Sequence, residues 1–315
     1  MKPAWADIEK ARVLLMESFP PTPLQLAGSL SDKAKRAYLK IETGLPTGSF
    51  KVRGALVALH AELARGPVRE VVAASTGNHG AAVAYAAKKM GIPAVIFLPE
   101  HANPVKRGRI AGLSARIVEV GVDITAALAE MRTYTRESGA FMLDDSTGLD
   151  VPVGTATIGC EIVEQLPTVS EIWVPMGDTA LIRGIAAAAK HLRPSVRVVG
   201  VQAENAPAYY LSWKKGEVIE TETCSTIADG LATRTPVAEN VAAIRELVDD
   251  ILLVREEQIL EAIRYLRRHE KVLAEPAGAA TTAAWIAHGP STNAVEVALV
   301  VTGGNIAEDI LRQVL

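Results

Sequence analysis

The sequence predicts an α/β protein built on mostly parallel, open twisted sheets that are flanked by helices. Three observations support this: short apolar runs rich in β-branched residues recur along the chain, longer segments with helical periodicity separate them, and 49% of the residues are hydrophobic. Alternating strands and helices are typical of parallel sheets covered on both faces. A chain of 315 residues can form one large domain or two ordinary ones.

The individual elements follow from local pattern. Short apolar runs bounded by charged or turn-forming residues predict strands at 38–42, 70–74, 94–98, 115–120, 171–175, 196–202 and 295–301. Apolar residues at helical spacing predict helices at 78–90, 123–137, 181–192 and 256–268, and a further helix that starts at Lys51. Scattered Pro and Gly in 205–240 predict loops with short helices.

Composition excludes several classes of protein. The net charge of −3 gives no reason to expect nucleic-acid or membrane partners. Cys160 and Cys224 lack the spacing of a metal or redox site, which fits a reduced compartment. The first residues lack the apolar core of a signal peptide, and the longest apolar runs, such as 297–301, have only the length of a strand. We therefore expect a cytoplasmic, globular protein.

Three polar, Gly-bearing loops follow predicted strands, at 75–80, 176–184 and 302–306. In open α/β sheets, ligands bind beyond the carboxyl ends of strands, so these loops are candidates to converge on one cleft. The first two loops open helices, and unpaired backbone N–H groups at a helix start attract a carboxylate or phosphate. Taken alone, the first loop is better explained by an ordinary N-cap, and His79 by a structural role.

Lys51 follows a Gly-Ser turn and opens a segment in which apolar residues recur at helical spacing. Burial at the start of a packed helix disfavours the ammonium form and lowers the pKa of a lysine. The free amine is then a nucleophile or base, able to form Schiff bases with carbonyl compounds, pyridoxal phosphate among them. An isolated lysine is more simply read as solvated, so this interpretation depends on the three loops.

Competing motifs are absent or incomplete. The segment 44–51 has glycines and a lysine, but its spacing is too short for a P-loop. No G-x-G-x-x-G follows a predicted strand, and no G-x-S-x-G elbow occurs. The basic residues Lys106, Arg107 and Arg109 are predicted to form a solvated helix face.

The motifs at 48–55 (Gly-Ser-Phe-Lys-Val-Arg-Gly-Ala), 75–80 (Ser-Thr-Gly-Asn-His-Gly) and 302–305 (Thr-Gly-Gly-Asn), in this order, resemble the serine/threonine dehydratases. These are fold-type II enzymes of the tryptophan synthase β-like superfamily, related to serine racemase and, more distantly, to threonine synthase and cysteine synthase. Weaker matches at 22–24, 40–42, 226–230, 248–250 and 275–279 extend the resemblance over nearly the whole chain.

The resemblance implies pyridoxal 5'-phosphate as cofactor. Lys51 is then the catalytic residue that forms the Schiff base and moves the Cα proton. The other expected cofactor contacts are Phe50 beside the ring, Asn78 at the ring 3-oxygen, Thr302 at the pyridine nitrogen, Glu275 near the ring edge, and Gly177, Asp178, Thr179, Ala180 and Leu181 around the phosphate. Ser75, Thr76, Gly77, Asn78 and His79 are expected to bind the substrate carboxylate.

Two departures from the family concern bound groups. The phosphate loop of these dehydratases is a run of glycines, whereas Asp178, Thr179 and Ala180 stand here, and a carboxylate beside a phosphate is unfavourable. The Thr179 hydroxyl or Arg183 offers compensation, although the simpler interpretation leaves Arg183 exposed. Related enzymes hold a divalent cation with Glu, a backbone carbonyl and Asp; Glu204 and Ala208 match, but Tyr210 occupies the third position, so we expect no metal.

Two further features concern the substrate. The segment 141–145 replaces a His-Pro-bearing segment common in threonine dehydratases, which leaves the substrate side chain open. Thr76 stands where racemases of this family carry a serine that reprotonates Cα, so it is a second candidate catalytic residue. Carboxylate binding or an N-cap is the simpler role for Thr76, because β-branching restricts its rotamers.

The resemblance implies a large cofactor domain, 1–69 plus 146–315, and a small mobile domain, 70–145, that carries the substrate loop. The expected reaction is β-elimination of water from threonine, serine or 3-hydroxyaspartate, giving a 2-oxo acid and ammonia, in a homodimer. The chain lacks room after Asn305 for the regulatory domain of biosynthetic threonine dehydratases. Alternatives are an amino-acid racemase, a replacement synthase on the same scaffold, and a non-catalytic binding protein.

Overall fold

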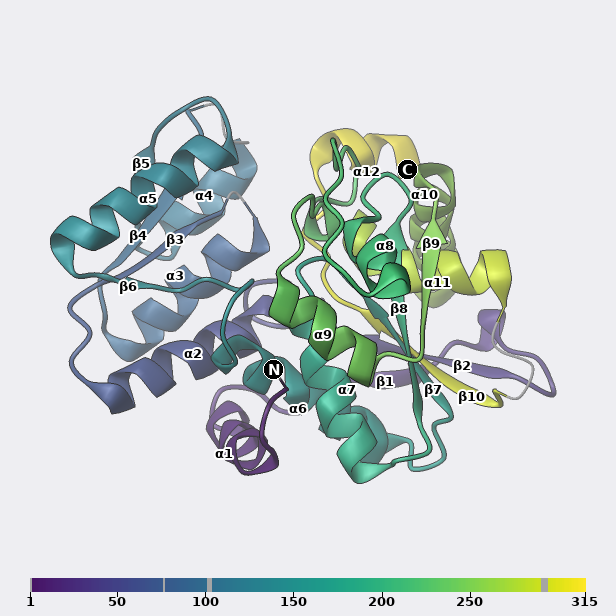
Figure 1. Ribbon diagram of the computed structural model, residues 1–315. Coiled ribbons are helices and arrows are strands. Elements are labelled where there is room, and N and C mark those ends of the chain that lie inside the picture. Colours follow the sequence, from purple (N-terminus) through teal and green to yellow (C-terminus); the bar gives the residue numbers. More distant parts are fainter. Residues whose placement is uncertain (1, 76, 101–103, 290–293) are drawn as a thin grey trace.

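The computed structural model describes residues 2–75, 77–100, 104–289 and 294–315, which form two separate open sheets (Figure 1). The larger sheet has the strand order β1-β2-β10-β7-β8-β9, and the smaller sheet has the order β5-β4-β3-β6. Neighbouring strands are parallel throughout, except that β1 pairs with β2 in the antiparallel sense. The predicted fold class is therefore confirmed.

The strands are β1 Leu24–Leu26, β2 Arg36–Ile41, β3 Val71–Ala74, β4 Ala94–Leu98, β5 Arg116–Glu119, β6 Phe141–Met142, β7 Glu171–Pro175, β8 Arg197–Ala203, β9 Asp250–Val254 and β10 Glu296–Val301. The α-helices are α1 Trp5–Met16, α2 Lys51–Arg65, α3 Asn78–Met90, α4 Pro104–Gly112, α5 Ile124–Ser138, α6 Asp150–Gln165, α7 Ala180–Leu192, α8 Ala208–Lys215, α9 Ala238–Leu247, α10 Glu256–Tyr265, α11 Pro276–His288 and α12 Glu308–Val314. Each predicted strand and helix is present with small shifts at its ends. The largest shift is in α10, which ends at Tyr265 because a π-helical turn, Leu266–Glu270, follows it.

Alternate residues of the central strands pack into different hydrophobic clusters. In β10, Leu299 belongs to one cluster, whereas its neighbours Ala298 and Val300 belong to another. The smaller sheet repeats this arrangement, with Ile96 on one face and Phe97 on the other. Since side chains alternate across a strand, both sheets bury both of their faces under helices. This explains why the sequence shows continuous apolar runs there.

Close packing of α6 against α7 fixes the start of α7. A Cβ atom on Gly184 of α7 would stand 2.3 Å from the Pro152 carbonyl oxygen of α6. One on Gly159 of α6 would stand 2.5 Å from the Ile185 carbonyl oxygen of α7. Only glycine allows the two backbones to approach this closely. The loop that precedes α7 is therefore held against a rigid helix pair.

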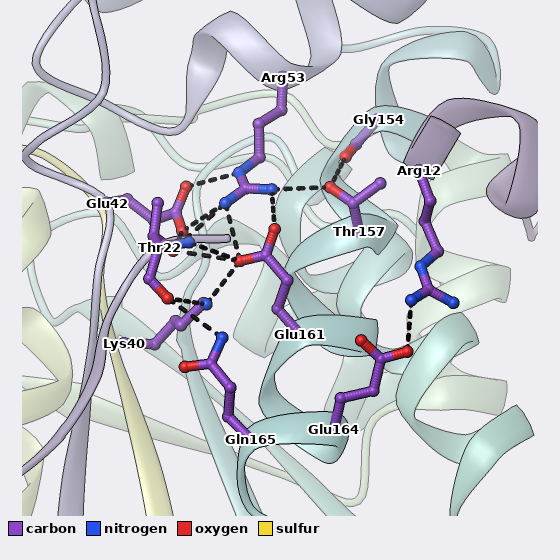
Figure 2. A network of polar contacts seen from close by, with 10 residues as sticks. All are labelled: Arg12, Thr22, Lys40, Glu42, Arg53, Gly154, Thr157, Glu161, Glu164 and Gln165. Atoms are coloured by element: carbon purple, nitrogen blue, oxygen red, sulfur yellow. Dashed lines mark hydrogen bonds and ion pairs between the residues drawn. The ribbon is translucent and has the colours of Figure 1, made fainter. Parts of the chain in front are cut away.

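A buried ionic network joins β2, α2 and α6 (Figure 2). Arg53 donates from Nε to Glu42 Oε2 at 2.8 Å and from Nη1 to Glu161 Oε1 at 2.6 Å. Lys40 donates to Glu161 Oε2 at 2.6 Å and to the Thr22 carbonyl oxygen at 2.7 Å. Burial alone would lower the pKa of Arg53, but the two carboxylates raise it above its ordinary value. The network fixes the first turn of α2, where Lys51 lies.

No helix within the described ranges is both long and apolar enough to span a bilayer.

Candidate active site

A cleft of about 370 Å³ lies at the carboxyl ends of β3, β7 and β10. The three loops that follow these strands all line it, so the predicted convergence is confirmed. The cleft-lining residues that the sequence singled out are Phe50, Lys51, Ser75, Gly77, Asn78, His79, Gly177, Asp178, Leu181, Glu275 and Thr302. Thr179 and Ala180 are buried beside the cleft without lining it, and Thr76 lies outside the described residues.

Lys51 is the first residue of α2, and its amine lies between two carboxylates. Nζ is 2.5 Å from Asp145 Oδ2 and 3.1 Å from Asp178 Oδ2, and it stands 5.3 Å from the centre of the Phe50 ring. Burial on its own would lower the pKa of Lys51, but the two carboxylates raise it above its ordinary value. The prediction of a lowered pKa for Lys51 is therefore wrong for the protein without cofactor, because the two carboxylates outweigh the effect of burial.

Asp145 also faces His79. The carboxylate Oδ2 lies 3.3 Å from His79 Nδ1, and His79 Nε2 lies 2.8 Å from the Leu143 carbonyl oxygen. Burial would raise the pKa of Asp145, but His79 and Lys51 hold it well below its usual range. Asp145 could not be singled out from the sequence, because only its contact with Lys51 in the folded chain distinguishes it from the neighbouring Asp144.

Amide side chains connect the loops after β3 and β10. Asn305 donates from Nδ2 to Asn78 Oδ1 at 2.6 Å and to the Thr47 carbonyl oxygen at 2.8 Å. Asn78 donates from its own Nδ2 to Glu275 Oε1 at 2.6 Å. The exposed Arg109 donates to Asn305 Oδ1 and lines the cleft. The prediction for Arg109, a solvated helix face, did not include this contact across the cleft.

The turn before Lys51 is joined to the loop after β10 through backbone hydrogen bonds. Phe50 N donates to the Thr302 carbonyl oxygen at 2.9 Å, and Gly304 N donates to the Gly48 carbonyl oxygen at 3.0 Å. Ser49 and Gly303 also pair as an isolated antiparallel bridge. These bonds place the start of α2 beside Thr302, whose side chain lines the cleft.

The loop before α7 has an unusual backbone. A Cβ atom on Gly177 would stand 2.2 Å from the Gly230 carbonyl oxygen, so only glycine fits there. Thr179 has a φ of 76°, in the left-handed region that a β-branched residue rarely adopts. Asp178 Oδ1 accepts from the Ala180 N–H at 2.9 Å. Burial raises the pKa of Asp178, Lys51 lowers it and the Asp145 carboxylate raises it, with a net increase.

Arg183, in the first turns of α7, is 1% exposed. The simpler expectation of an exposed arginine is therefore wrong, because every residue of α7 from Ala180 to Ala186 is buried and no face of its first turns meets solvent. The Nε and Nη2 atoms of Arg183 have no hydrogen-bond partner among the described residues, nor does Thr179 Oγ1.

Within the described ranges, no three His, Cys, Asp or Glu side chains gather closely enough to hold a metal ion. At the position that matches a metal ligand in related enzymes, Tyr210 donates its backbone N–H to Gln202 Oε1 at 2.8 Å.

Removing the Asp145 charge tests the electrostatics of the cleft. In cofactor-free protein at neutral pH, Asp145→Asn is expected to lower the free energy of unfolding by about 1–3 kcal/mol, because a charged hydrogen bond is lost. The folded-state pKa of Asp145 lies below its ordinary 3.8, so this contribution is fully present above pH 3.8 and is lost as the pH falls through the folded-state value. Urea titrations of the two proteins should therefore begin to converge as the pH falls below 3.8 and should agree only once the pH is below the folded-state pKa of Asp145. A difference that persists unchanged in acid contradicts the assignment.

Comparison with known proteins agrees with this geometry. The sequence profile of a family described as pyridoxal-phosphate dependent enzymes matches residues 15–303. An L-threonine ammonia-lyase of Thermotoga maritima is 35% identical over 310 residues, which cover 98% of this chain and 77% of the relative. A catabolic L-threonine dehydratase of Staphylococcus aureus is 34% identical over 305 residues, covering 95% and 88% respectively.

Two solved structures are similar over nearly their whole length. Maize serine racemase superposes with a TM-score of 0.94 at 29% identity, covering 99% of this chain and 97% of the racemase. The T.th. threonine deaminase superposes with a TM-score of 0.89 at 33% identity, covering 97% of this chain and 99% of the deaminase.

Proposed function

Since the chain belongs to the family of pyridoxal-phosphate dependent enzymes, we propose that it is an ammonia-lyase acting on a small 2-amino-3-hydroxy acid. The candidate substrates are threonine, serine and 3-hydroxyaspartate. Loss of water from such a substrate leaves an enamine, whose imine tautomer is hydrolysed to a 2-oxo acid and ammonia. The threonine ammonia-lyases and dehydratases that resemble the chain over nearly its whole length support threonine first.

The cleft residues fit pyridoxal phosphate. The observation on which the proposal depends is that a lysine amine and the start of a helix line the same cleft. Lys51 would provide the amine that holds the cofactor's aldehyde, and the start of α7 would provide backbone N–H groups for its phosphate, apart from that of Ala180, which Asp178 Oδ1 accepts. Buried polar atoms without a partner at that helix start, on Thr179 and Arg183, are also suited to an anion. When bound, the cofactor withdraws electrons from Cα of the substrate.

The remaining steps belong to residues of the chain. We assign to Lys51 the removal of the Cα proton, because it lines the cleft from the start of a helix that the Arg53 network holds in place. Ser75 and Gly77, in the loop before α3, and His79, in its first turn, are proposed to bind the substrate carboxylate. Thr76, which lies outside the described residues, is proposed to join them. Asn78 is proposed to contact the cofactor ring, with Asn305 and Glu275 fixing its amide. Phe50 is proposed to pack beside the ring, and Thr302 is proposed to meet the pyridine nitrogen.

The two sheets support a division into domains at 1–69 plus 146–315 and at 70–145. In this proposal the smaller domain moves toward Lys51 and brings with it the loop that follows β3. This movement excludes water from the cleft. The proposal includes a homodimer located in the cytoplasm, and sedimentation of the purified protein tests the dimer.

The function is tested with purified protein and added pyridoxal phosphate. L-Threonine, L-serine and 3-hydroxyaspartate are supplied separately, and ammonia and 2-oxo acid are measured together with the enantiomer composition of the remaining substrate. We expect stoichiometric ammonia and 2-oxo acid from at least one substrate. Racemisation without ammonia indicates a racemase, and product that forms only with an added nucleophile indicates a replacement synthase. Failure to bind the cofactor at all indicates a binding protein, and each of these outcomes overturns the proposal.

A further inference from the structure

Arg183 is a buried cation that the proposed reaction does not use. It is the fourth residue of α7 and is 1% exposed, yet its Nε and Nη2 atoms have no hydrogen-bond partner in the part of the chain that the structure describes. Burying a guanidinium without such partners is costly. Helical side chains lean toward the N-terminus of their helix, so Arg183 extends toward the loop before α7. Burial lowers the pKa of Arg183, and the nearby Asp178 and Tyr209 partly offset this effect.

Thr179 is a second, independent indication that polar side chains at the start of α7 lack hydrogen-bond partners among the described residues. It is the N-cap residue of α7, and its carbonyl oxygen accepts the Arg183 N–H at 2.9 Å. Its hydroxyl is buried without a partner, and its backbone is strained at a φ of 76°. Two unsatisfied polar side chains at the start of a 13-residue helix indicate a site for a group that supplies hydrogen-bond acceptors.

The charges around this helix start explain why a cation is needed. The Asp178 carboxylate accepts the Ala180 N–H, so a negative charge already lies on the positive end of α7. A phosphate that binds there is repelled by this carboxylate. Lys51 offsets the carboxylate while its amine lies 3.1 Å from Asp178, but the cofactor's aldehyde would draw that amine away from this ion pair. A second positive charge close to the loop would then balance Asp178.

We propose that Arg183 supplies the positive charge that allows a carboxylate-bearing loop to hold the cofactor's phosphate. Its guanidinium offsets Asp178 and attracts the phosphate from behind the loop, because Arg183 and Thr179 are buried beside the cleft and do not line it. Arg183 thus helps to bind and orient the cofactor and takes no part in proton transfer. Arginine suits the position because it stays charged when buried.

The experiment compares pyridoxal phosphate with pyridoxal, which lacks only the phosphate. Dissociation constants are measured by absorbance titration of cofactor-free protein. Arg183→Met is expected to weaken binding of pyridoxal phosphate by about tenfold to a hundredfold, as for loss of a charged hydrogen bond, and to change pyridoxal binding by less than about twofold. Lys190→Met is the matched control, because it removes a cation from the far end of α7, where Lys190 pairs with Asp249. It should leave both constants unchanged.

Two further variants keep the test decisive if Arg183→Met does not fold. Arg183→Lys retains the charge and should keep the preference for pyridoxal phosphate over pyridoxal within about threefold of the native ratio. Asp178→Asn should increase that preference, because the repelling carboxylate is gone. Equal weakening of both ligands in Arg183→Met, or an unchanged preference in Asp178→Asn, overturns the inference. Since no substrate is involved, these results do not depend on which reaction the enzyme catalyses.

Discussion

Replacing Lys51 by alanine is expected to abolish the visible absorbance of the bound cofactor and to reduce ammonia release by about 10³-fold or more, since both the attachment point and the catalytic base are lost. The Asp145 and Asp178 carboxylates, 2.5 and 3.1 Å from Nζ, then face each other without the ammonium. Absorbance spectra and ammonia assays of the purified variant measure the effect. Borohydride reduction of the wild type should attach the cofactor to Lys51.

Lys51→Arg separates the chemical role of the amine from its electrostatic role. Arginine keeps a positive charge between the two carboxylates but is not a nucleophile at neutral pH. We therefore expect the arginine variant to lose absorbance and activity as the alanine variant does, while its urea midpoint stays closer to that of the wild type. Retention of the absorbance band by either variant removes Lys51 from the centre of the proposed reaction.

Arg53→Met is expected to lower the free energy of unfolding by about 3–5 kcal/mol, the range for breaking a buried ion pair from one side. Arg53 is 1% exposed, and its loss leaves the fully buried Glu42 without its guanidinium partner. Lys40 still contacts Glu161 Oε2, so part of the network remains. Urea unfolding followed by circular dichroism measures the change, and Arg53→Lys covers the case in which the methionine variant does not fold.

The same region offers a matched control. Arg12 pairs with Glu164 one turn along α6 from Glu161, but these side chains are 32% and 49% exposed (Figure 2). Exposed ion pairs contribute about 0–1 kcal/mol, so Arg12→Met should have a small effect. If Arg12→Met and Arg53→Met lower the free energy of unfolding equally, burial of the Arg53 ion pairs is not the cause of the effect.

The elements with strong local patterns could be predicted from the sequence. β4 and β7 are found at the predicted residues, because a short, mainly apolar run bounded by turn residues is typical of a central strand. β1 spans three residues and β6 spans two, which is too short for a recognisable hydrophobic pattern in the sequence. β9 was also not predicted; it is an edge strand, and its role in the sheet depends on pairing with β8.

The candidate site was predictable only where the family motifs mark it. Motifs located Lys51 and the loops that line the cleft, but contacts made by folding decided the charges there. Neither the approach of Asp145 to Lys51 nor the burial of Arg183 follows from local sequence, because each depends on residues that are distant along the chain. Local reasoning therefore gave the wrong direction for the pKa of Lys51.

The two carboxylates beside Lys51 have a consequence for the kinetics of reconstitution. Only the uncharged amine attacks an aldehyde, and Asp145 and Asp178 raise the pKa of Lys51, so the reactive fraction is small near neutrality. As the pH rises toward that pKa, the fraction increases about tenfold for each pH unit. The freshly synthesised chain should thus take up its cofactor slowly at neutral pH and faster in alkali, although the assembled enzyme no longer carries the ammonium that causes the delay.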